Sequence, residues 1–267
     1  DLSTEGDMIW INGGQLLDPK SGQLKNVPSP LYENPVSDNG FFAKDKHGTL
    51  WWASHYFLYR LDKSGNRFQW IKELELPEKI FNKTDALHSG IQSGKLWLSF
   101  NGKLLQYAPE TKTQQWFDLK SWGLSVSRIT VIEEDRDGKL WLGSDAGLVQ
   151  VDPALAMASA DKPANGAHRQ YTVNDGLPNN FICGLLTEGD SCLWLSTNHG
   201  LSRFHIQSGA FVNFFEEDGL TYNEFNRKSY FKASNGRMFF GGMRGVNAFF
   251  PEAVMRAYQN RDQSVRM

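Results

Sequence analysis

The sequence predicts an all-β protein built from six repeated units, and two observations support this fold class. A short motif recurs in which a small or polar turn precedes an apolar residue and then an aromatic one. We call the aromatic positions the markers, and they are Trp10, Trp51, Trp97, Trp141, Trp194 and Phe239. An aliphatic residue follows each marker by seven positions, at Leu17, Leu58, Leu104, Leu148, Leu201 and Val246. Successive markers lie 41, 46, 44, 53 and 45 residues apart, a period typical of β-propeller blades.

Within a unit the apolar residues alternate with a period of two, which indicates strands. In the fourth unit, residues 129–134, 139–143 and 147–151 form predicted strands, with a tight turn at Asp137-Gly138 between the first two. A fourth strand, carrying Tyr171, closes the unit. Four antiparallel strands per repeat predict a β-propeller of six four-stranded blades.

The two ends of the chain depart from the regular repeat. Residues 1–6 are too short and polar for a good innermost strand, and the last unit lacks a fourth strand. We therefore expect the first and last blades to be incomplete, with the propeller over residues 1–251 and a connector or tail over residues 252–267. The 53-residue spacing has a local cause, because residues 153–167 enlarge the turn between the third and fourth strands of the fourth unit.

The marker aromatics are predicted to be core residues. Each blade is a twisted sheet that stacks on its neighbours, so large rings are needed between the sheets. This role is expected for Trp51, Trp97, Trp141, Trp194 and Phe239.

Composition excludes several classes of function. The 267 residues include 28 basic and 30 acidic side chains, for a formal charge of −2, whereas nucleic-acid and anionic-lipid binding need concentrated Lys and Arg. No apolar stretch approaches the length of a membrane span, and residues 1–5 do not resemble a signal peptide. We expect no nucleic-acid partner and no membrane contact by this segment itself.

Four stretches resemble the two-component-regulator propellers, the periplasmic sensor region of membrane histidine kinases, including hybrid two-component sensors. Residues 132–148 resemble the repeat, residues 174–180 and 217–226 resemble the linkers between blades, and residues 240–251 resemble the closing blade. The resemblance implies an extracytoplasmic, ligand-sensing module of a membrane-anchored sensor, with no catalysis of its own and a glycan fragment as its signal. It also implies contacts with neighbouring domains of the same sensor and with a homodimer partner.

The sequence contains few candidates for catalytic residues. The chain has no zinc-binding His or Cys pattern, no Gly-x-Ser-x-Gly elbow and no phosphate-binding loop. Adjacent acids such as Glu133 and Glu134 lie in extended segments and point to opposite sides. We therefore predict no catalytic residue, no metal site and no cofactor.

Propeller topology restricts where a binding site lies. Turns between second and third strands, and links between blades, gather at one face of the fold. Aromatic, amide and charged groups on that face suit a sugar or a peptide, although an ordinary polar surface or a protein interface has the same composition. The candidate ligand-binding residues are His55, Tyr56, Phe100, Asn101, Asp145, Asn180, Asn198, His199, Glu224 and Arg244.

Two other classes of function stay open beside the sensor module. One is a propeller-fold lyase acting on a cyclic peptide or polysaccharide, in which His199 or His55 would be needed for turnover. The other is a scaffold that binds only proteins.

The two cysteines are predicted to stay unpaired. A hairpin turn centred on Gly189-Asp190 places Cys183 opposite Ser196 and Cys192 opposite Thr187. The thiols are then about 13 Å apart along the ladder at about 3.3 Å per residue, beyond the reach of a disulfide.

Overall fold

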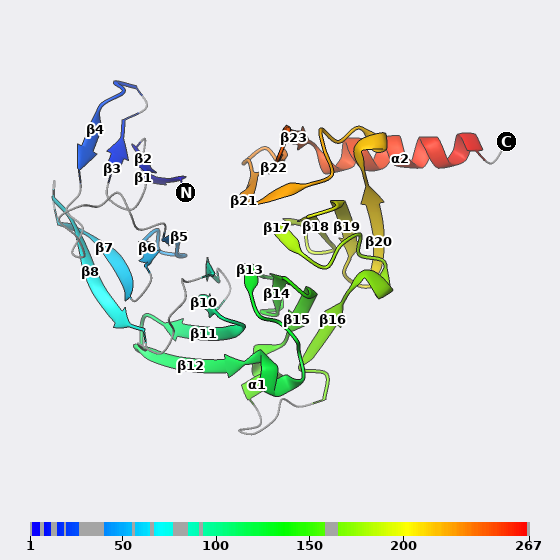
Figure 1. Ribbon diagram of the computed structural model, residues 1–267. Helices are drawn as coiled ribbons and strands as arrows, with labels where there is room; N and C mark the ends of the chain where they lie inside the picture. The colour runs from blue at the N-terminus through cyan, green and yellow to red at the C-terminus, as the bar shows by residue number, and fades with distance from the viewer. Residues whose placement is uncertain are drawn as a thin grey trace. The chain divides into compact units, whose positions relative to one another are not determined.

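The computed structural model describes residues 2–5, 8–11, 15–18, 20–26, 40–54, 57–64, 67–76, 85–90, 93–157 and 165–265. The chain divides into two compact units, residues 1–138 and 139–267. Figure 1 draws the strands of each unit as successive small sheets. The predicted all-β propeller fold is confirmed.

The first unit contains three complete sheets, each a meander in which neighbouring strands in the sequence pair. The first sheet has β1 (Leu2–Glu5), β2 (Met8–Ile11), β3 (Gln15–Leu17) and β4 (Leu24–Asn26). The second has β5 (Phe41–Lys44), β6 (Leu50–Ala53), β7 (Phe57–Ser64) and β8 (Arg67–Glu75). The third has β9 (Ala86–Ser89), β10 (Leu96–Phe100), β11 (Lys103–Ala108) and β12 (Thr113–Asp118).

The fourth sheet has the order β13-β14-β15-β16, and the boundary between the units falls in the turn before β14. Its strands are β13 (Ile129–Glu134), β14 (Leu140–Ser144), β15 (Gly147–Val151) and β16 (His168–Tyr171). The fifth sheet has β17 (Ile182–Glu188), β18 (Cys192–Thr197), β19 (Gly200–His205) and β20 (Ala210–Phe214). The sixth has β21 (Phe225–Lys232), β22 (Met238–Gly242) and β23 (Gly245–Phe249).

The described residues thus form five four-stranded blades and one three-stranded blade, not six four-stranded blades, and the prediction that the first blade is incomplete is wrong. The first blade is complete, because Leu2–Glu5 pairs residue by residue with β2, from Leu2 opposite Ile11 to Glu5 opposite Met8. Strand pairing uses backbone groups, so the polar side chains of this short segment do not prevent it. The last blade has three strands, as expected.

Neighbouring blades stack through their first strands within each unit. In the first unit β1 lies beside β5, β5 beside β9, and β9 beside β13, while in the second unit β17 lies beside β21. This arrangement buries the faces of the sheets against one another, as blade packing requires.

The markers Trp51, Trp97, Trp141 and Trp194 are fully buried, as predicted. Three of them contact an aromatic residue of the next blade. Each ring meets the aromatic residue ten positions after the following marker. Ring centroids are 6.2 Å apart for Trp51 and Tyr107, 5.6 Å for Trp141 and Phe204, and 4.8 Å for Trp194 and Phe249. These aromatic pairs add to the apolar area that the blades bury.

Phe239 is half-buried, so its prediction as a core residue is wrong. Its neighbours Met238 and Phe240 face the core shared with the fifth blade. Because side chains alternate along a strand, Phe239 faces the other side of the sheet. There it contacts Phe231, which is 63% exposed.

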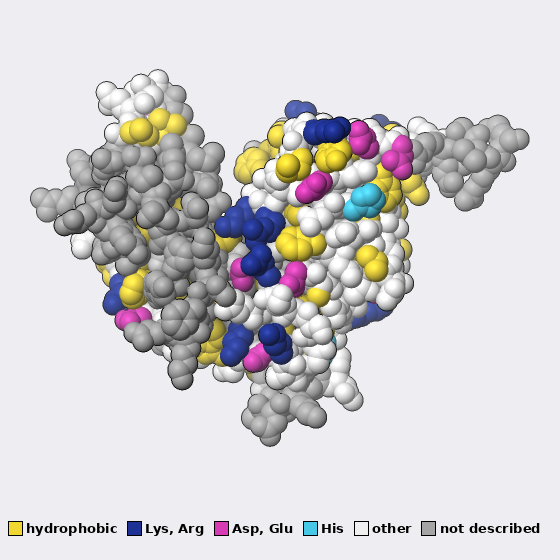
Figure 2. Space-filling model, viewed as in Figure 1, with side chains coloured by type: hydrophobic (Ala, Val, Ile, Leu, Met, Phe, Trp, Pro, Cys, Tyr) yellow, Lys and Arg dark blue, Asp and Glu magenta, His cyan; other side chains and the backbone are white. Residues whose placement is uncertain are grey.

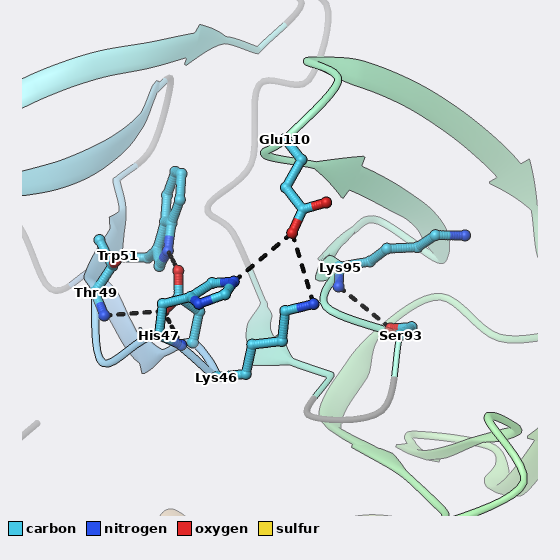
Figure 3. A network of polar contacts seen from close by, with 8 residues as sticks. Lys46, His47, Thr49, Trp51, Ser93, Lys95 and Glu110 are labelled. Carbon is cyan, nitrogen blue, oxygen red and sulfur yellow. Dashed lines mark hydrogen bonds and ion pairs between the residues drawn. The ribbon is translucent and has the colours of Figure 1, made fainter.

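The markers Trp51 and Trp194 each donate the indole N–H to a carboxylate six residues earlier. Trp51 donates to Asp45 Oδ2 at 2.9 Å, and Trp194 donates to Glu188 Oε2 at 2.7 Å. Asp45 also accepts the backbone N–H groups of His47 and Thr49. One carboxylate thus fixes the turn and the marker together, as Figure 3 shows around Trp51.

The hairpin of the fifth blade corrects the predicted register. Cys192 lies opposite Glu188, Ser196 lies opposite Gly184, and Cys183 is the extra residue of a bulge between Ile182 and Gly184. Both thiols are free and buried. They are separated by five positions along β17, about 16 Å at about 3.3 Å per residue.

Helices are short or terminal in the described chain. The insertion after β15 contains α1 (Pro153–Met157) and lies between the third and fourth strands of its blade, as predicted. Single 3-10 turns follow three fourth strands, namely η2 (Leu119–Trp122), η3 (Val173–Asp175) and η4 (Glu216–Asp218).

The helix α2 (Pro251–Val265) lies where the sequence predicts only a connector or tail over residues 252–267. Pro251 occupies the first helical position, where its missing N–H costs nothing. Val254, Met255 and Tyr258 lie on one side of the helix and pack against the core of the last two blades. The Tyr258 ring meets Phe214 at 5.9 Å, so this segment is docked on the second unit.

Candidate functional site

The predicted binding face is clearest in the second unit. Its turns follow β14, β18 and β22, and its links between blades run over residues 172–181 and 215–224. All of these segments lie at the same end of their blades, because the strands of each meander alternate in direction.

Asn198 and Glu224 lie around the buried thiol of Cys183. The thiol donates to Asn198 Oδ1 at 3.2 Å and lies 3.2 Å from the carbonyl oxygen of Phe225. Burial raises the pKa of Cys183 to about 12, while the positive charge of Arg227 lowers it and the negative charge of Glu224 raises it. The thiol is therefore protonated and structural, and it ties the β18–β19 turn to the start of β21.

His199 and Arg244 are exposed, and each lies beside an aromatic ring. The His199 ring is 5.5 Å from that of Phe215. The Arg244 guanidinium lies 4.3 Å above the Tyr222 ring, a cation–π contact that holds the side chain in place. Each of these two side chains thus lies beside an aromatic ring near the ends of the blades.

Asn180 has a structural role. Its Oδ1 accepts the backbone N–H of Val173 at 2.9 Å, seven residues earlier. The next link repeats this contact, because the Glu216 N–H donates to Asn223 Oδ1 at 2.7 Å. Both amides close their link onto the preceding 3-10 turn, so the Asn180 oxygen already has a partner within the fold.

The remaining candidates of this unit lie at the edges of the same face. Asp145 is half-buried in the β14–β15 turn, and Glu224 is exposed at the residue before β21. The backbone carbonyl of Glu224 accepts the N–H of Met243 at 3.1 Å, which joins the last link to the β22–β23 turn.

In the first unit the structure separates the candidates. Phe100 is fully buried and packs against Trp116 at 6.0 Å, so its ring is not available to a ligand. It ends β10, and its side chain points into the core rather than out of the turn. Asn101 is exposed in the turn, where its N–H donates to Asp85 Oδ2 at 3.2 Å. His55 and Tyr56 lie outside the described residues.

His88 is a partly buried histidine on a first strand of this unit. His88 Nδ1 on β9 is 4.0 Å from Glu133 Oε2 on β13. Burial lowers the pKa of His88 to about 4, so at neutral pH the imidazole is uncharged. At neutral pH His88 and Glu133 therefore form a packed polar contact and not an ion pair.

Three residues of the second unit were missed by the sequence analysis. Tyr222 and Phe215 supply the rings beside Arg244 and His199, and Arg227 lies near the Cys183 thiol. The aromatic residues in the links were the available signal, because both rings are half-buried beside polar turns.

Within the part of the chain that the structure describes, no group of three or more His, Cys, Asp or Glu side chains is arranged to hold a metal ion. No described helix combines the length and the apolar character needed to span a membrane.

Comparison with family models supports the resemblance found in the sequence. Residues 123–146 match the model described as "Two component regulator propeller". These residues include β13, β14 and the turn between them.

A curated relative is similar over nearly the whole chain. "Histidine kinase P4" of Formosa agariphila is 20% identical over 275 residues, covering 95% of this chain and 19% of the relative. The chain therefore spans about a fifth of the length of that protein.

Solved structures share the fold at low identity. An extracellular domain assigned to the hybrid two-component system BT3049 of B. thetaiotaomicron has a TM-score of 0.75 at 19% identity, covering 96% of this chain and 34% of that one. Virginiamycin B lyase of Staphylococcus aureus has a TM-score of 0.65 at 12% identity, covering 93% of this chain and 83% of that one. At these identities the likeness shows the propeller fold alone.

Proposed function

We propose that this chain is a ligand-sensing propeller module of a membrane-anchored two-component sensor histidine kinase, located outside the cytoplasm and without catalysis of its own. The observation that carries the proposal is the match of residues 123–146 to the two-component-regulator propeller model. A relative named as a histidine kinase, and similar extracellular domains of two-component systems, support it.

We further propose that the ligand is a glycan fragment bound by the second unit. Tyr222 and Phe215 offer ring faces, and Arg244, His199 and Asn198 offer polar groups beside them. A ring covers the apolar face of a sugar, while polar groups fix its hydroxyls. Neighbouring domains of the same sensor and a homodimer partner would receive the signal.

Binding of oligosaccharides to the 267-residue chain tests this function. We expect saturable heat of binding in calorimetry with at least one member of a panel of neutral and acidic oligosaccharides. His199→Ala and Arg244→Ala should each weaken that binding about tenfold. Asn235→Ala is the matched control, because Asn235 lies in the β21–β22 turn at the other end of the strands.

Two outcomes would contradict the proposal. Binding that survives both substitutions would place the site elsewhere. Consumption of an oligosaccharide or a cyclic peptide, lost on His199→Ala, would support a lyase instead. The fold shared with virginiamycin B lyase is the reason to include this assay, although at 12% identity it carries no assignment of residues.

A further inference from the structure

The sixth blade ends at an edge strand that carries no charge. In the described chain β23 is its last strand, whereas the other five blades continue with a fourth strand. Native sheets commonly protect an edge strand with charged side chains or a covering segment, because its backbone groups can pair with another chain. The fourth strands β8, β12 and β16 contain charged residues, and α2 contacts β20 through Tyr258 and Phe214. The edge of β23 has no charge of this kind.

Val246 on β23 lies on the side of the sixth blade that is turned away from the fifth, which we call the free face. Phe240 belongs to the core shared with the fifth blade, so its neighbours Phe239 and Gly241 face the other way. Val246 lies opposite Gly241 and shares its face. Helix α2 packs with the Phe240 core, and it leaves Val246 58% exposed.

The free face carries an apolar surface. The Phe231 ring lies 6.2 Å from that of Phe239 and is 63% exposed. The Arg237 guanidinium lies 5.3 Å from the Phe239 ring and 6.0 Å from that of Phe250, which is also exposed. Figure 2 shows hydrophobic side chains on the visible surface over the part of the molecule where Figure 1 draws β22 and β23. Contiguous exposed apolar surface marks an interaction site.

The third, fourth and fifth blades show what covers the corresponding surface. In each of them the aliphatic residue seven positions after the marker is at most 2% exposed. It lies opposite an aromatic residue of the fourth strand. The opposed pairs are Leu104 with Phe117, Leu148 with Tyr171, and Leu201 with Phe214.

The same aromatic residue also contacts the marker of its own blade. Ring centroids are 6.0 Å apart for Trp97 and Phe117, 6.3 Å for Trp141 and Tyr171, and 5.5 Å for Trp194 and Phe214. One side chain of the fourth strand thus covers both the aliphatic residue and the marker. In the sixth blade Val246 and Phe239 hold these two positions, and no fourth strand covers them among the described residues.

We infer that the edge of β23 accepts an extended strand from another polypeptide, which places an aromatic side chain opposite Val246 and against Phe239. Strand addition takes its affinity from main-chain hydrogen bonds and its specificity from the side chains that the sheet receives. The added strand continues the pairing that the chain builds in its complete blades. The inference goes beyond the proposed function, because it uses neither the ligand nor the residues that would bind it.

A peptide copied from a fourth strand tests the inference. The probe is a peptide of residues 165–174, which contains β16 and has Tyr171 as its one Phe, Tyr or Trp residue. Added to the 267-residue chain, it should slow hydrogen exchange of residues 245–249 in a saturable way, because pairing protects backbone amides. The same peptide with Tyr171→Ser should bind at least tenfold more weakly.

Variants of the chain locate the peptide on the free face. Val246→Asp should weaken binding at least tenfold, because it places a charge on the apolar surface, and its Tm should stay close to that of the unchanged chain. Val173→Asp is the matched control, since Val173 is an exposed valine in a link of the same unit. It should bind the peptide as the unchanged chain does.

Phe239→Ala separates a ring contact from general stickiness. It should weaken binding of the Tyr171 peptide and leave binding of the Tyr171→Ser peptide unchanged, because both substitutions remove the same contact. Equal losses for the two peptides would overturn the placement of the aromatic side chain.

Three further outcomes would overturn the inference. The first is equal binding of the two peptides, or binding of neither. The second is slow exchange of residues 245–249 in the free chain at every concentration, which would mean that this chain covers its own edge. The third is slow exchange that appears only as the chain concentration rises, with a dimer in light scattering, which would make a second copy the occupant.

Discussion

The fifth and sixth blades carry the same repeat, yet the same positions have different surroundings. The marker Trp194 is fully buried, whereas the marker Phe239 is half-buried. Seven positions later, Leu201 is 2% exposed and Val246 is 58% exposed. Leu201 lies opposite Phe214 of the fourth strand, and the sixth blade has no fourth strand among the described residues.

Two further positions of the repeat also have different surroundings in the two blades. Gly200 and Gly245 both have positive φ, but a Cβ on Gly200 would lie 2.9 Å from the Phe214 carbonyl, and the nearest atom to one on Gly245 is 3.9 Å away. Six residues before the marker, Glu188 accepts the indole N–H of Trp194, while the sixth blade has Ala233 at that position and a marker without an N–H.

The comparison teaches that the repeat specifies strands and their alternation, but not burial. A residue becomes core only when a neighbouring strand or blade covers it.

Removing the marker side chains should give the largest difference in stability between variants of the two blades. Trp194→Ala should lower the free energy of unfolding by about 3–5 kcal/mol, because it leaves a cavity beside Phe214 and Phe249. Phe239→Ala should cost only about 1 kcal/mol, since its ring is half-exposed. Urea titration of both variants measures the effects, and equal losses would show that Phe239 is covered in solution.

The aliphatic residue seven positions after the marker should show the same difference in stability between the two blades, with smaller losses. Leu201→Ala should cost about 2–4 kcal/mol, whereas Val246→Ala should change stability by less than about 0.5 kcal/mol. The m-values should stay equal, because neither change alters the extent of the fold. A large loss from Val246→Ala would indicate that another sheet packs on this side.

Glu188 should make the stability of the fifth blade depend on pH, whereas the sixth blade has no carboxylate at the matching position. Burial by itself raises the pKa of Glu188, but hydrogen bonds from Arg203 and Trp194 outweigh it and lower the pKa. Arg203 donates through Nε at 2.7 Å and Nη2 at 3.0 Å. A lowered pKa means that the stabilisation is present above the unfolded value of about 4.3 and is lost as the pH falls.

Glu188→Gln should therefore lower stability by about 1–2 kcal/mol at pH 7 and by less below about pH 4. Ala233→Gln in the sixth blade is the matched control, and its effect should not depend on pH. Denaturant titrations at pH 7 and pH 3.5 decide the matter, since a pH-independent loss would mean that Glu188 acts through packing alone.

Thiol reactivity should distinguish the two blades without changing stability. Cys183 is buried and burial raises its pKa to about 12, so iodoacetamide should modify it only on unfolding. A Val246→Cys variant should react fast in the folded protein, because that position is exposed. Mass spectrometry of timed samples measures both rates. Rapid modification of Cys183 would show that the fifth blade opens.

Much of the fold was predictable from the chain. The alternation of apolar residues located most strands, and the marker spacing placed the second strands of all six blades. The first strand β1 was missed because polar side chains conceal a strand that pairs through its backbone. Helix α2 was missed because its apolar residues are few and gain their partners only from two blades.

The end of the blades at which the candidate residues lie was predictable, but their surroundings were not. Topology correctly grouped Asn198, His199 and Arg244 at one end of the blades. It did not show that Phe100 points into the core or that Asn180 caps a link. Nor did it show the register shift between Phe225 and Tyr230 of β21, because a register shift depends on what packs beside the strand.

The sequence by itself determined the period, the strands and which residues share a face, because these follow from local geometry and the alternation of side chains. Tertiary structure decided the rest. It made Trp194 core and left Phe239 half-buried, fixed the register around Cys183, and set Lys228 in a left-handed conformation. Burial, register and strain depend on contacts between residues far apart in the chain, and only the packed blades bring those residues together.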